Sequence, residues 1–436
     1  MNGELKFDAI IIGAGIIGAC TAFEMAKRGW KTLNVDKLPA AGYGSTSFSC
    51  AIIRTHYSTL PGTALAYEGS FRWRDWAGYL GIEDERGMAR YKQTGCLILK
   101  TEGNNHSRSV LGHADELGIE WEDWSADQIK LKFPFMELDC YAPPHNPDHP
   151  DFAVPNGAMI EGGIYFPLAG YMNDPQLASH NAQVAAEAHG ATFRFKAEVT
   201  EIRQSENKVI GITLADGEQI DAPVVINVGG PHSSKINALA GVVDKMTMST
   251  RALRQEVAYI PAMPGFDFEN EGPLLSDNDV GIYSRPETGN KMVVGSENPE
   301  CDTDIWVDPD NNPESLTDQA THQVMRLAQR IPTLGIPGQL NGVVACYDAT
   351  PDWIPIYDKS DLGGYYMAIG TSGNQFKNAP IAGAMMATLI EACEGGRDHD
   401  KDPVSFQLET INRIIDIGFF SRNRAINSDS SFSVLG

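Results

Sequence analysis

The sequence predicts an α/β plus α+β protein, in which a discontinuous Rossmann-like domain is joined to a second domain built on an antiparallel sheet. Three observations support this fold class. Strand, glycine turn and helix follow one another at residues 8–36, 224–231 and 364–383, these blocks are far apart in the chain, and the stretches between them contain β-rich runs. The 436 residues are enough for two or three domains.

The first block contains the spacing G-x-G-x-x-G between an apolar strand and a helical run. Gly13 is expected to make the tight turn, Gly15 to leave room for phosphates, and Gly18 to let the helix pack close to the strand. Asp36 ends the next strand 21 residues beyond Gly15, where it can accept a hydrogen bond from a ribose hydroxyl. The block predicts a dinucleotide site, and the fingerprint alone does not separate NAD from FAD.

The middle of the chain returns to an alternating α/β pattern at about residue 162. Asp174 and Pro175 are typical of the N-cap and first position of a helix that continues to about Ala188. Short strands follow this helix, and the last one leads into a second glycine turn. We therefore expect one nucleotide-binding domain assembled from three pieces. Its expected bounds are 1–90, 162–240 and 343–398, while 91–161 and 241–342 form a substrate-binding domain and 399–436 a C-terminal linker and tail.

Composition narrows the class of protein. The net charge of −23 argues against nucleic acid or an anionic membrane as a partner. No apolar run reaches the roughly 18 residues of a membrane span, and we expect a cytoplasmic location. The seven cysteines are scattered without a C-x-x-C spacing, so neither a disulfide framework nor a metal site is expected. The Pro/His/Asp-rich passage 143–155 predicts a surface loop, with a lid over the site as the alternative.

The order of the three blocks, with Gly342–Pro355 before the last, resembles the D-amino-acid oxidase and sarcosine oxidase superfamily of FAD enzymes from about residue 7 to residue 390. Within it, Gly44–Tyr57 is similar to the monomeric sarcosine oxidase and dimethylglycine dehydrogenase branch. The resemblance implies FAD as the cofactor. The cofactor-binding residues expected from the motifs and the resemblance are Gly13, Gly15, Ile16, Ile17, Gly18, Asp36, Lys37, Gly44, Ser45, Thr46, Ser49, Val199, Gly229, Gly230, Gly370, Ser372, Gly373, Asn374, Gln375, Phe376 and Lys377.

The third block has a physical reason to face a flavin. Its glycine loop, Gly370–Phe376, enters a helix near Pro380, and a helix N-terminus directs N–H groups and a positive dipole end at negative charge. Such charge develops on the N1 and C2 carbonyl region of a reduced flavin. The alternative is an ordinary strand-to-helix turn made of the usual turn residues.

Two cations stand in unusual places for a solvated charge. Arg54 follows an apolar run, and Lys377 follows Phe376 in the glycine loop. In the sarcosine oxidase branch the matching Arg and Lys hold the substrate carboxylate, to which Arg offers two parallel donors and Lys a point charge. The alternative has Arg54 on the flavin pyrophosphate and Lys377 paired with a surface acid.

Other candidates follow from the resemblance. Tyr347 matches an active-site tyrosine of that branch, Tyr57 and Tyr283 are weaker candidates of the same kind, and a half-buried strand position is the alternative for each. His56 is expected to be structural or to face solvent. Asn374 stands where a histidine is frequent in this loop, a change that can alter the flavin potential.

Two features of the branch are missing from this sequence. The lysine that activates oxygen in sarcosine oxidases aligns with Val293, although Lys291 lies two residues away on the same strand face. Either oxygen or another electron acceptor is therefore open. The cysteine that bonds flavin aligns with Ala345, and the adjacent Cys346 would point to the opposite face of a strand, so we expect noncovalent FAD.

The resemblance implies oxidation of the C–N bond of a carboxylate-bearing secondary or tertiary amino acid, of the N-methyl type. Hydride passes to flavin N5 and the imine then hydrolyses, so positioning matters more than a strong base or a nucleophile. A D-amino-acid, opine or 2-hydroxy-acid dehydrogenase is the first alternative. A non-catalytic flavin-binding subunit is the second.

Overall fold

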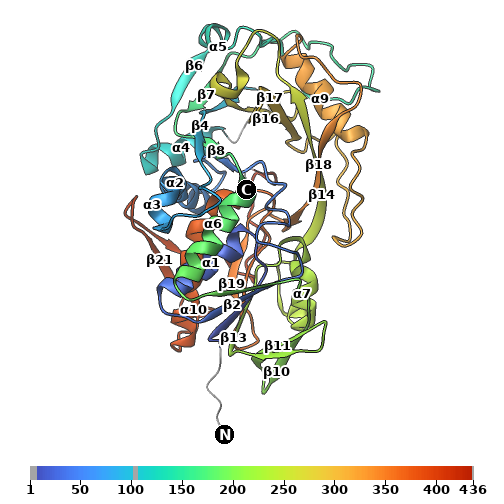
Figure 1. Ribbon diagram of the computed structural model, residues 1–436. Coiled ribbons are helices and arrows are strands. Elements are labelled where there is room, and N and C mark those ends of the chain that lie inside the picture. Colours follow the sequence, from blue (N-terminus) through green and yellow to red (C-terminus); the bar gives the residue numbers. More distant parts are fainter. Residues whose placement is uncertain (1–6, 102–106, 435–436) are drawn as a thin grey trace.

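The computed structural model describes residues 7–101 and 107–434, and two sheets dominate it (Figure 1). In Figure 1 the six-stranded sheet, with helices α1, α6 and α10, occupies the lower half, and the eight-stranded sheet, with α9, the upper half. None of the described helices is long and apolar enough to cross a membrane.

The six-stranded sheet collects strands from distant parts of the chain in the order β19-β20-β13-β1-β2-β9. All neighbours are parallel except the antiparallel pair β19 and β20. Its strands are β1 (Ala9–Ile12), β2 (Thr32–Asp36), β9 (Thr192–Phe195), β13 (Val224–Asn227), β19 (Ile356–Lys359) and β20 (Tyr365–Ile369).

Both faces of this sheet are covered, which explains why β1 and β13 are almost continuously apolar. Ala9 and Ile11 pack with helices α1 (Ile16–Lys27), α6 (Pro175–Ala188) and α10 (Ala379–Glu394). Ile10 and Ile12 pack on the other face, under β10 (Val199–Ser205), β11 (Lys208–Leu214), β12 (Gln219–Asp221) and α7 (Ser233–Leu239). The predicted helix at 175–188 is present, and the Asp174 carboxylate caps it by accepting from the Leu177 N–H at 2.8 Å.

The eight-stranded sheet has the order β18-β14-β17-β16-β15-β5-β7-β6. Neighbours are antiparallel except β15 and β5, a parallel pair that the sequence pattern does not predict. Its strands are β5 (Cys96–Leu99), β6 (Glu122–Ser125), β7 (Gly162–Phe166), β14 (Arg251–Pro261), β15 (Leu274–Asp277), β16 (Ile282–Glu287), β17 (Lys291–Ser296) and β18 (Asn341–Ala349).

The two faces of this sheet differ in character. On one face Ile260, Ile282, Met292 and Val294 form a core with helix α9 (Asp318–Arg330). The opposite face carries the side chains that alternate with these, and it includes the predicted residues Tyr283, Val293 and Tyr347. The predicted site residues Tyr283, Val293 and Tyr347 therefore lie on the face of the second sheet that is not packed on α9.

The remaining elements join the two sheets or cover their edges. Residues 405–420 form a hairpin and a 3-10 turn whose buried side chains, Phe406 and Phe420 among them, belong to the same core as α1 and α10. These elements are β3 (Ile52–Ile53), α2 (Leu60–Arg74), α3 (Trp76–Leu80), β4 (Tyr91–Gln93), α4 (Ser107–Leu117), α5 (Ala126–Lys132), β8 (Gly170–Met172), α8 (Phe268–Glu271), β21 (Ser405–Leu408), β22 (Arg413–Asp416) and the 3-10 helices Gly230–His232, Val243–Lys245, Phe376–Asn378 and Ile417–Phe420.

Candidate active site

The glycine turn between β1 and α1 has the geometry that its spacing predicts. Gly13 has φ +121°, and a Cβ there would lie 2.5 Å from the Val228 carbonyl oxygen. A Cβ on Gly18 would lie 2.3 Å from the Gly13 carbonyl oxygen, so the helix needs glycine to approach the strand. Helix α1 begins after Gly15 without a side-chain cap or an acidic first turn. The end of this helix is therefore suited to an anion.

Asp36 closes β2 beside this turn. Its carboxylate accepts hydrogen bonds from the Ala14 N–H at 2.8 Å and the Leu38 N–H at 2.9 Å. Burial raises the pKa of Asp36, and these two amides partly oppose that shift. Lys37, in contrast, turns to an ion pair with Asp310 and lies 3.0 Å from Nε2 of His232. Asp36 is thus fixed at the carboxyl edge of the parallel strands, where open α/β sheets bind ligands.

The segment after β2 links the glycine turn to the second sheet. The Thr46 hydroxyl accepts from the Ile16 N–H at 3.1 Å, and the Ser45 hydroxyl donates to the Cys346 carbonyl at 3.0 Å. The Ser49 hydroxyl accepts from the Ala51 N–H at 3.0 Å. The predicted residues 44–49 therefore run from the first turn of α1 to β18.

The remaining predicted cofactor residues lie around the same edge or below it. Gly229 and Gly230 follow β13, where the Gly229 N–H donates to the Asn227 side chain at 3.0 Å. Val199 is half-buried at the start of β10, two residues after an amide that donates to the Asp36 carbonyl at 2.8 Å. No described contact assigns Val199 a specific role.

The third block is tied to the second by one buried carboxyl group, Asp348 on β18. Its side chain accepts from the Gly370 N–H at 2.7 Å and from the Ser233 hydroxyl at 2.8 Å. Burial raises the pKa of Asp348 to about 7, and these hydrogen bonds oppose the shift. Asp348 is not predictable from the sequence, because its partners follow β13 and β20 and no local pattern links them to β18.

The glycine loop after β20 places its small residues against Tyr347. Gly373 has φ +69°, and a Cβ there would lie 2.3 Å from the Tyr347 ring. Ser372, also at positive φ, donates its N–H to the Asp348 carbonyl at 2.8 Å. Burial raises the pKa of the Tyr347 hydroxyl and of the Tyr283 hydroxyl, and each tyrosine also acts on the pKa of the other.

The larger residues of this loop turn into the protein. The Asn374 amide donates to the Trp353 carbonyl at 3.3 Å, and the Gln375 side chain accepts from the Tyr357 hydroxyl at 2.8 Å. Phe376 stacks on Trp73 with 5.0 Å between ring centroids. A cofactor contact at these three positions would therefore use the backbone.

Arg54 and Lys377, which are 323 residues apart, meet at the Tyr57 ring. The Lys377 Nζ lies 4.7 Å from the ring centroid and the Arg54 Cζ 5.0 Å from it. Lys377 is buried and donates to the Tyr57 hydroxyl at 2.9 Å. Burial and the nearby Arg54 charge hold the pKa of Lys377 well below its usual range.

No described carboxylate forms an ion pair with either cation. Arg54 Nη2 donates to the Val434 carbonyl, while its Nε is buried and has no partner among the described residues. The alternative in which Lys377 pairs with a surface acid therefore finds no support among the described ion pairs. His56 is buried and stacks on Phe166, so it does not face solvent.

Comparisons with known proteins identify the family of this chain. Residues 8–389 match the family model described as FAD dependent oxidoreductase. The chain belongs to this FAD-dependent oxidoreductase family. It is 25% identical to a monomeric sarcosine oxidase of Bacillus sp. over 93% of this chain and 98% of that protein. It is 23% identical to N-methyl-L-tryptophan oxidase of Salmonella arizonae, with 88% and 94% covered.

Its fold is shared with solved structures of oxidoreductases. An L-proline dehydrogenase from P. horikoshii superimposes with a TM-score of 0.75 at 19% identity, covering 96% of this chain and 98% of that one. The protein is an FAD-dependent amino-acid oxidoreductase of the sarcosine and glycine oxidase type.

The described residues fit FAD. The α1 N-terminus, whose N-cap Gly15 supplies no side chain, can hold the pyrophosphate, and the fixed Asp36 carboxylate can accept from a ribose hydroxyl. In the Gly370–Gly373 turn Asp348 takes the N–H groups of Gly370 and Ser372, so those of Thr371 and Gly373 are the ones that can face the flavin ring. Gly13 and Gly373 are required by the local backbone itself, because a side chain at either would collide with its neighbours.

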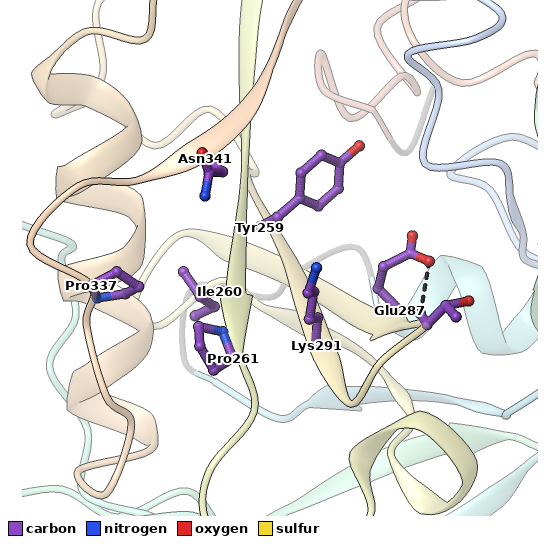
Figure 2. A pocket seen from close by; sticks show the side chains of 8 residues that line it. Tyr259, Ile260, Pro261, Glu287, Lys291, Pro337 and Asn341 are labelled. Atoms are coloured by element: carbon purple, nitrogen blue, oxygen red, sulfur yellow. Dashed lines mark hydrogen bonds between the residues drawn. The ribbon is translucent and has the colours of Figure 1, made fainter.

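The register of β17 decides which residue of this chain occupies the position that aligns with the oxygen-activating lysine of sarcosine oxidases. Val293 is buried between Tyr259 and Arg285, while Lys291 lies opposite Glu287 at the end of the strand. Lys291 is exposed and lines a pocket of about 550 Å³ (Figure 2). Val293 and Lys291 therefore share a face, but Lys291 lies farther along the strand from Gly295, where the Tyr283 ring packs.

Arg285 and Cys50 are neighbours of this region that the sequence analysis missed. The Arg285 guanidinium lies over the Tyr171 ring and is ion-paired with Glu287 at 3.0 Å. The Cys50 Sγ is 3.4 Å from the Tyr283 hydroxyl. On β18, Ala345 shares the face of Tyr347, while Cys346 points to the other face, where its Sγ accepts from the Asn312 amide at 3.3 Å.

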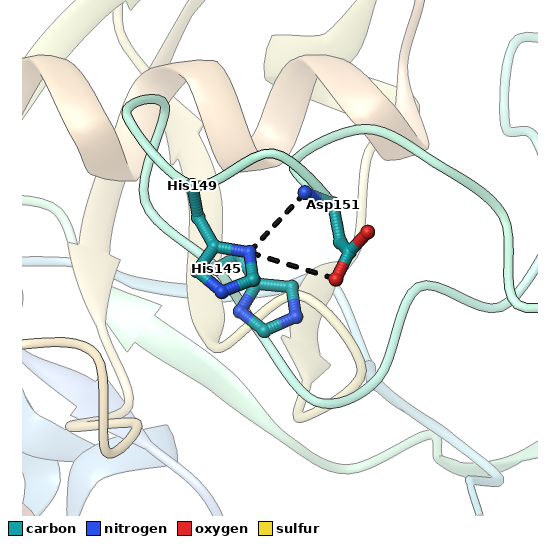
Figure 3. A group of neighbouring side chains, drawn as sticks. All are labelled: His145, His149 and Asp151. Carbon is teal, nitrogen blue, oxygen red and sulfur yellow. Dashed lines mark hydrogen bonds and ion pairs between the residues drawn. The ribbon is translucent and has the colours of Figure 1, made fainter.

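A group of His145, His149 and Asp151 lies in the surface passage 143–155 (Figure 3). The two imidazole rings are stacked at 3.9 Å with an interplanar angle of 8°, and His149 Nδ1 already accepts the Asp151 N–H at 3.2 Å. An imidazole lone pair lies in the plane of its ring, so two stacked, nearly parallel rings keep their lone pairs in separate planes that do not meet at a common ion. The group therefore has no geometry that assigns it a metal.

Proposed function

We propose that this enzyme oxidises the C–N bond of a carboxylate-bearing secondary or tertiary amino acid, of the N-methyl type. The observation that carries the proposal is the convergence of Arg54 and Lys377 on one tyrosine, where their described partners are the Val434 carbonyl and the Tyr57 hydroxyl and Asn374 carbonyl, and no described carboxylate. Two cations in such a place lack a counter-charge that an amino-acid carboxylate would supply. Relatives whose names specify sarcosine and N-methyl-L-tryptophan favour N-methyl substrates.

Each residue has a defined task in this proposal. Arg54 offers parallel donors to the substrate carboxylate. Lys377 adds a positive charge, and the bound carboxylate favours the protonated form of this lysine. Tyr57 holds Lys377 in place through its hydroxyl. Tyr347, packed against Gly373, borders the space that we assign to the amine. FAD supplies the two-electron acceptor, and the protein contributes alignment, which can lower a barrier by several kcal/mol.

The same pair of cations, Arg54 and Lys377, would hold any small carboxylate, so D-amino acids, opines and 2-hydroxy acids form the competing substrate class. The burial of Val293 at the position of the oxidase lysine favours an electron acceptor other than oxygen. We therefore propose slow reoxidation by oxygen as a property of this enzyme.

The test mixes the enzyme without oxygen with a panel of N-methyl amino acids, D-amino acids, opines and 2-hydroxy acids. The absorption of the bound flavin measures how fast each compound reduces it. N-methyl amino acids should bleach the flavin fastest. Lys377→Met should lower the ratio of reduction rate to Kd by about 100-fold, as expected for a lost interaction of about 3 kcal/mol. Lys132→Met, at an exposed lysine of α5, is the matched control.

Three outcomes would overturn the proposal. Flavin reduction by N-methyl amino acids that is unchanged in Lys377→Met would show that Lys377 does not hold the substrate carboxylate. Faster bleaching by another substrate class would change the activity. Flavin that none of these compounds reduces would identify a non-catalytic flavin-binding subunit. Readmission of oxygen then measures the reoxidation rate.

A further inference from the structure

Glu297 is a half-buried residue whose carboxyl group has one buried oxygen without a described partner. It follows the last residue of β17, and its backbone N–H donates to the Gly281 carbonyl at 3.2 Å. Its Oε1 accepts from the Ser276 hydroxyl at 2.6 Å. Its Oε2 is buried and has no partner among the described residues. A buried acceptor without a partner is destabilising, so this oxygen is suited to a ligand.

Its contacts place Glu297 on the face of the second sheet that carries Tyr283, because Ser276, which donates to Glu297, pairs with Tyr283 across β15 and β16. The Arg54 charge acts on the pKa of Glu297, and the charges of both groups act on the buried thiol of Cys96. Gly295, two residues earlier, lies under the Tyr283 ring, where a Cβ would be 2.3 Å from the ring. Arg54 and Glu297 are not among the described ion pairs, and each keeps a buried polar atom without a described partner.

The two unpartnered atoms are complementary. Arg54 Nε is a donor and requires an acceptor, whereas Glu297 Oε2, when ionised, is an acceptor and requires a donor. An α-amino acid carries a carboxylate and an ammonium group separated by one carbon, so it can satisfy both atoms at once. A plain carboxylate can satisfy only Arg54.

We propose that Glu297 binds the ammonium group of the amino acid and accepts its proton. The N–H bond of the substrate ammonium breaks, an O–H bond forms at Glu297 Oε2, and the nitrogen keeps the electron pair as the neutral amine that oxidation requires. This inference rests on the proposed function, because it needs the substrate carboxylate at Arg54 and Lys377.

The charges around Glu297 suit that exchange. Burial and the Asp277 charge raise its pKa to about 8, while the Ser276 hydroxyl and Arg54 lower it. The described groups that act on it come from β15 (Ser276 and Asp277) and from Arg54, which follows β3, with the Cys96 thiol of β5 also nearby. Glu297 is mostly protonated below pH 8, so the fraction able to take a proton from an ammonium group increases as the pH rises through about 8.

The test compares two ligands of nearly the same shape, 2-aminoisobutyrate and pivalate, which differ by an ammonium in place of a methyl group. Neither carries a hydrogen on the α-carbon, so neither can be oxidised there. Their Kd values are measured from the flavin absorption change of the holoenzyme. Wild type should prefer 2-aminoisobutyrate. Glu297→Gln should lower that preference at least 10-fold and leave pivalate binding within about 3-fold, whereas Glu300→Gln, at an exposed neighbour, should change neither.

The outcomes separate this inference from the proposed function. If Glu297→Gln weakens both ligands equally, the residue is only structural and the inference is wrong. If pivalate binding depends on Lys377 but the preference for 2-aminoisobutyrate over pivalate is unchanged in Glu297→Gln, the proposed carboxylate site is supported and this inference is wrong. If neither ligand perturbs the wild-type flavin, both fail. Should Glu297→Gln lose flavin, Glu297→Asp, with its displaced carboxylate, must lower the same preference.

A kinetic readout gives an independent check. The anaerobic reduction rate at low substrate should rise with pH through about 8 in wild type, because only ionised Glu297 can accept the proton. This step in the pH profile should be absent from Glu297→Gln. A variant profile that keeps the step would overturn the assignment.

Discussion

At the scale of single residues, the unusual group is Lys377, because a buried lysine next to an arginine loses its proton more readily than an exposed one. Carboxylate binding favours the charged lysine, so the affinity for pivalate should fall as the pH rises through the lowered pKa of Lys377. The flavin absorption titration measures this in the Glu297→Gln background, where Glu297 cannot ionise. Lys377→Met should bind weakly with a flat pH profile, and a pH dependence that survives in Lys377→Met would contradict this role.

Asp348 makes a second prediction at this scale. Its pKa in the folded protein, about 7, lies above the ordinary value of an aspartate. A raised folded-state pKa gives stability that is complete below about pH 4 and is lost as the pH rises to about 7. Asp348→Asn should remove roughly 2–4 kcal/mol of this pH dependence. Urea unfolding of both proteins at pH 4.5 and pH 8 measures the difference, and parallel profiles would show that Asp348 does not titrate in this range.

At the scale of elements, a glycine with positive φ lies near each end of helix α1. Substitutions at these two positions separate the effect of backbone strain from the effect of close contact. Gly29 has φ +88° and open space around it, whereas Gly13 also faces the Val228 carbonyl. Gly29→Ala should lower the free energy of unfolding by about 1–2 kcal/mol and leave the flavin content unchanged. Gly13→Ala should be clearly more destabilising and should lose flavin. Equal flavin content in the two variants would contradict the role of this turn.

At the scale of the whole molecule, the sequence predicts the parts that depend on local pattern. The strand, glycine turn and helix around Gly13, and the Asp174 cap of α6, follow from spacing and backbone conformation alone. The meeting of Arg54 and Lys377 was predictable only through the family resemblance, since no local pattern links residues 323 apart.

Other features of the molecule could not be predicted in this way. In the sequence, Asp348 and Glu297 are not distinguishable from ordinary acidic residues of strands and loops. Their environment depends on partners contributed by distant segments. The parallel pairing of β15 with β5 likewise depends on tertiary contacts between segments 178 residues apart at Leu274 and Cys96. Local composition carries no information about such contacts.

A crystal structure of the flavin-containing protein with bound 2-aminoisobutyrate tests the central claim most directly. The account predicts FAD along the carboxyl edge of β1 and β2, and the ligand carboxylate within hydrogen-bonding distance of both Arg54 and Lys377. The Val434 carbonyl, which now accepts from Arg54, should give way to the carboxylate. A carboxylate bound away from these two cations, with Lys377 still donating only to Tyr57 and Asn374, would contradict it.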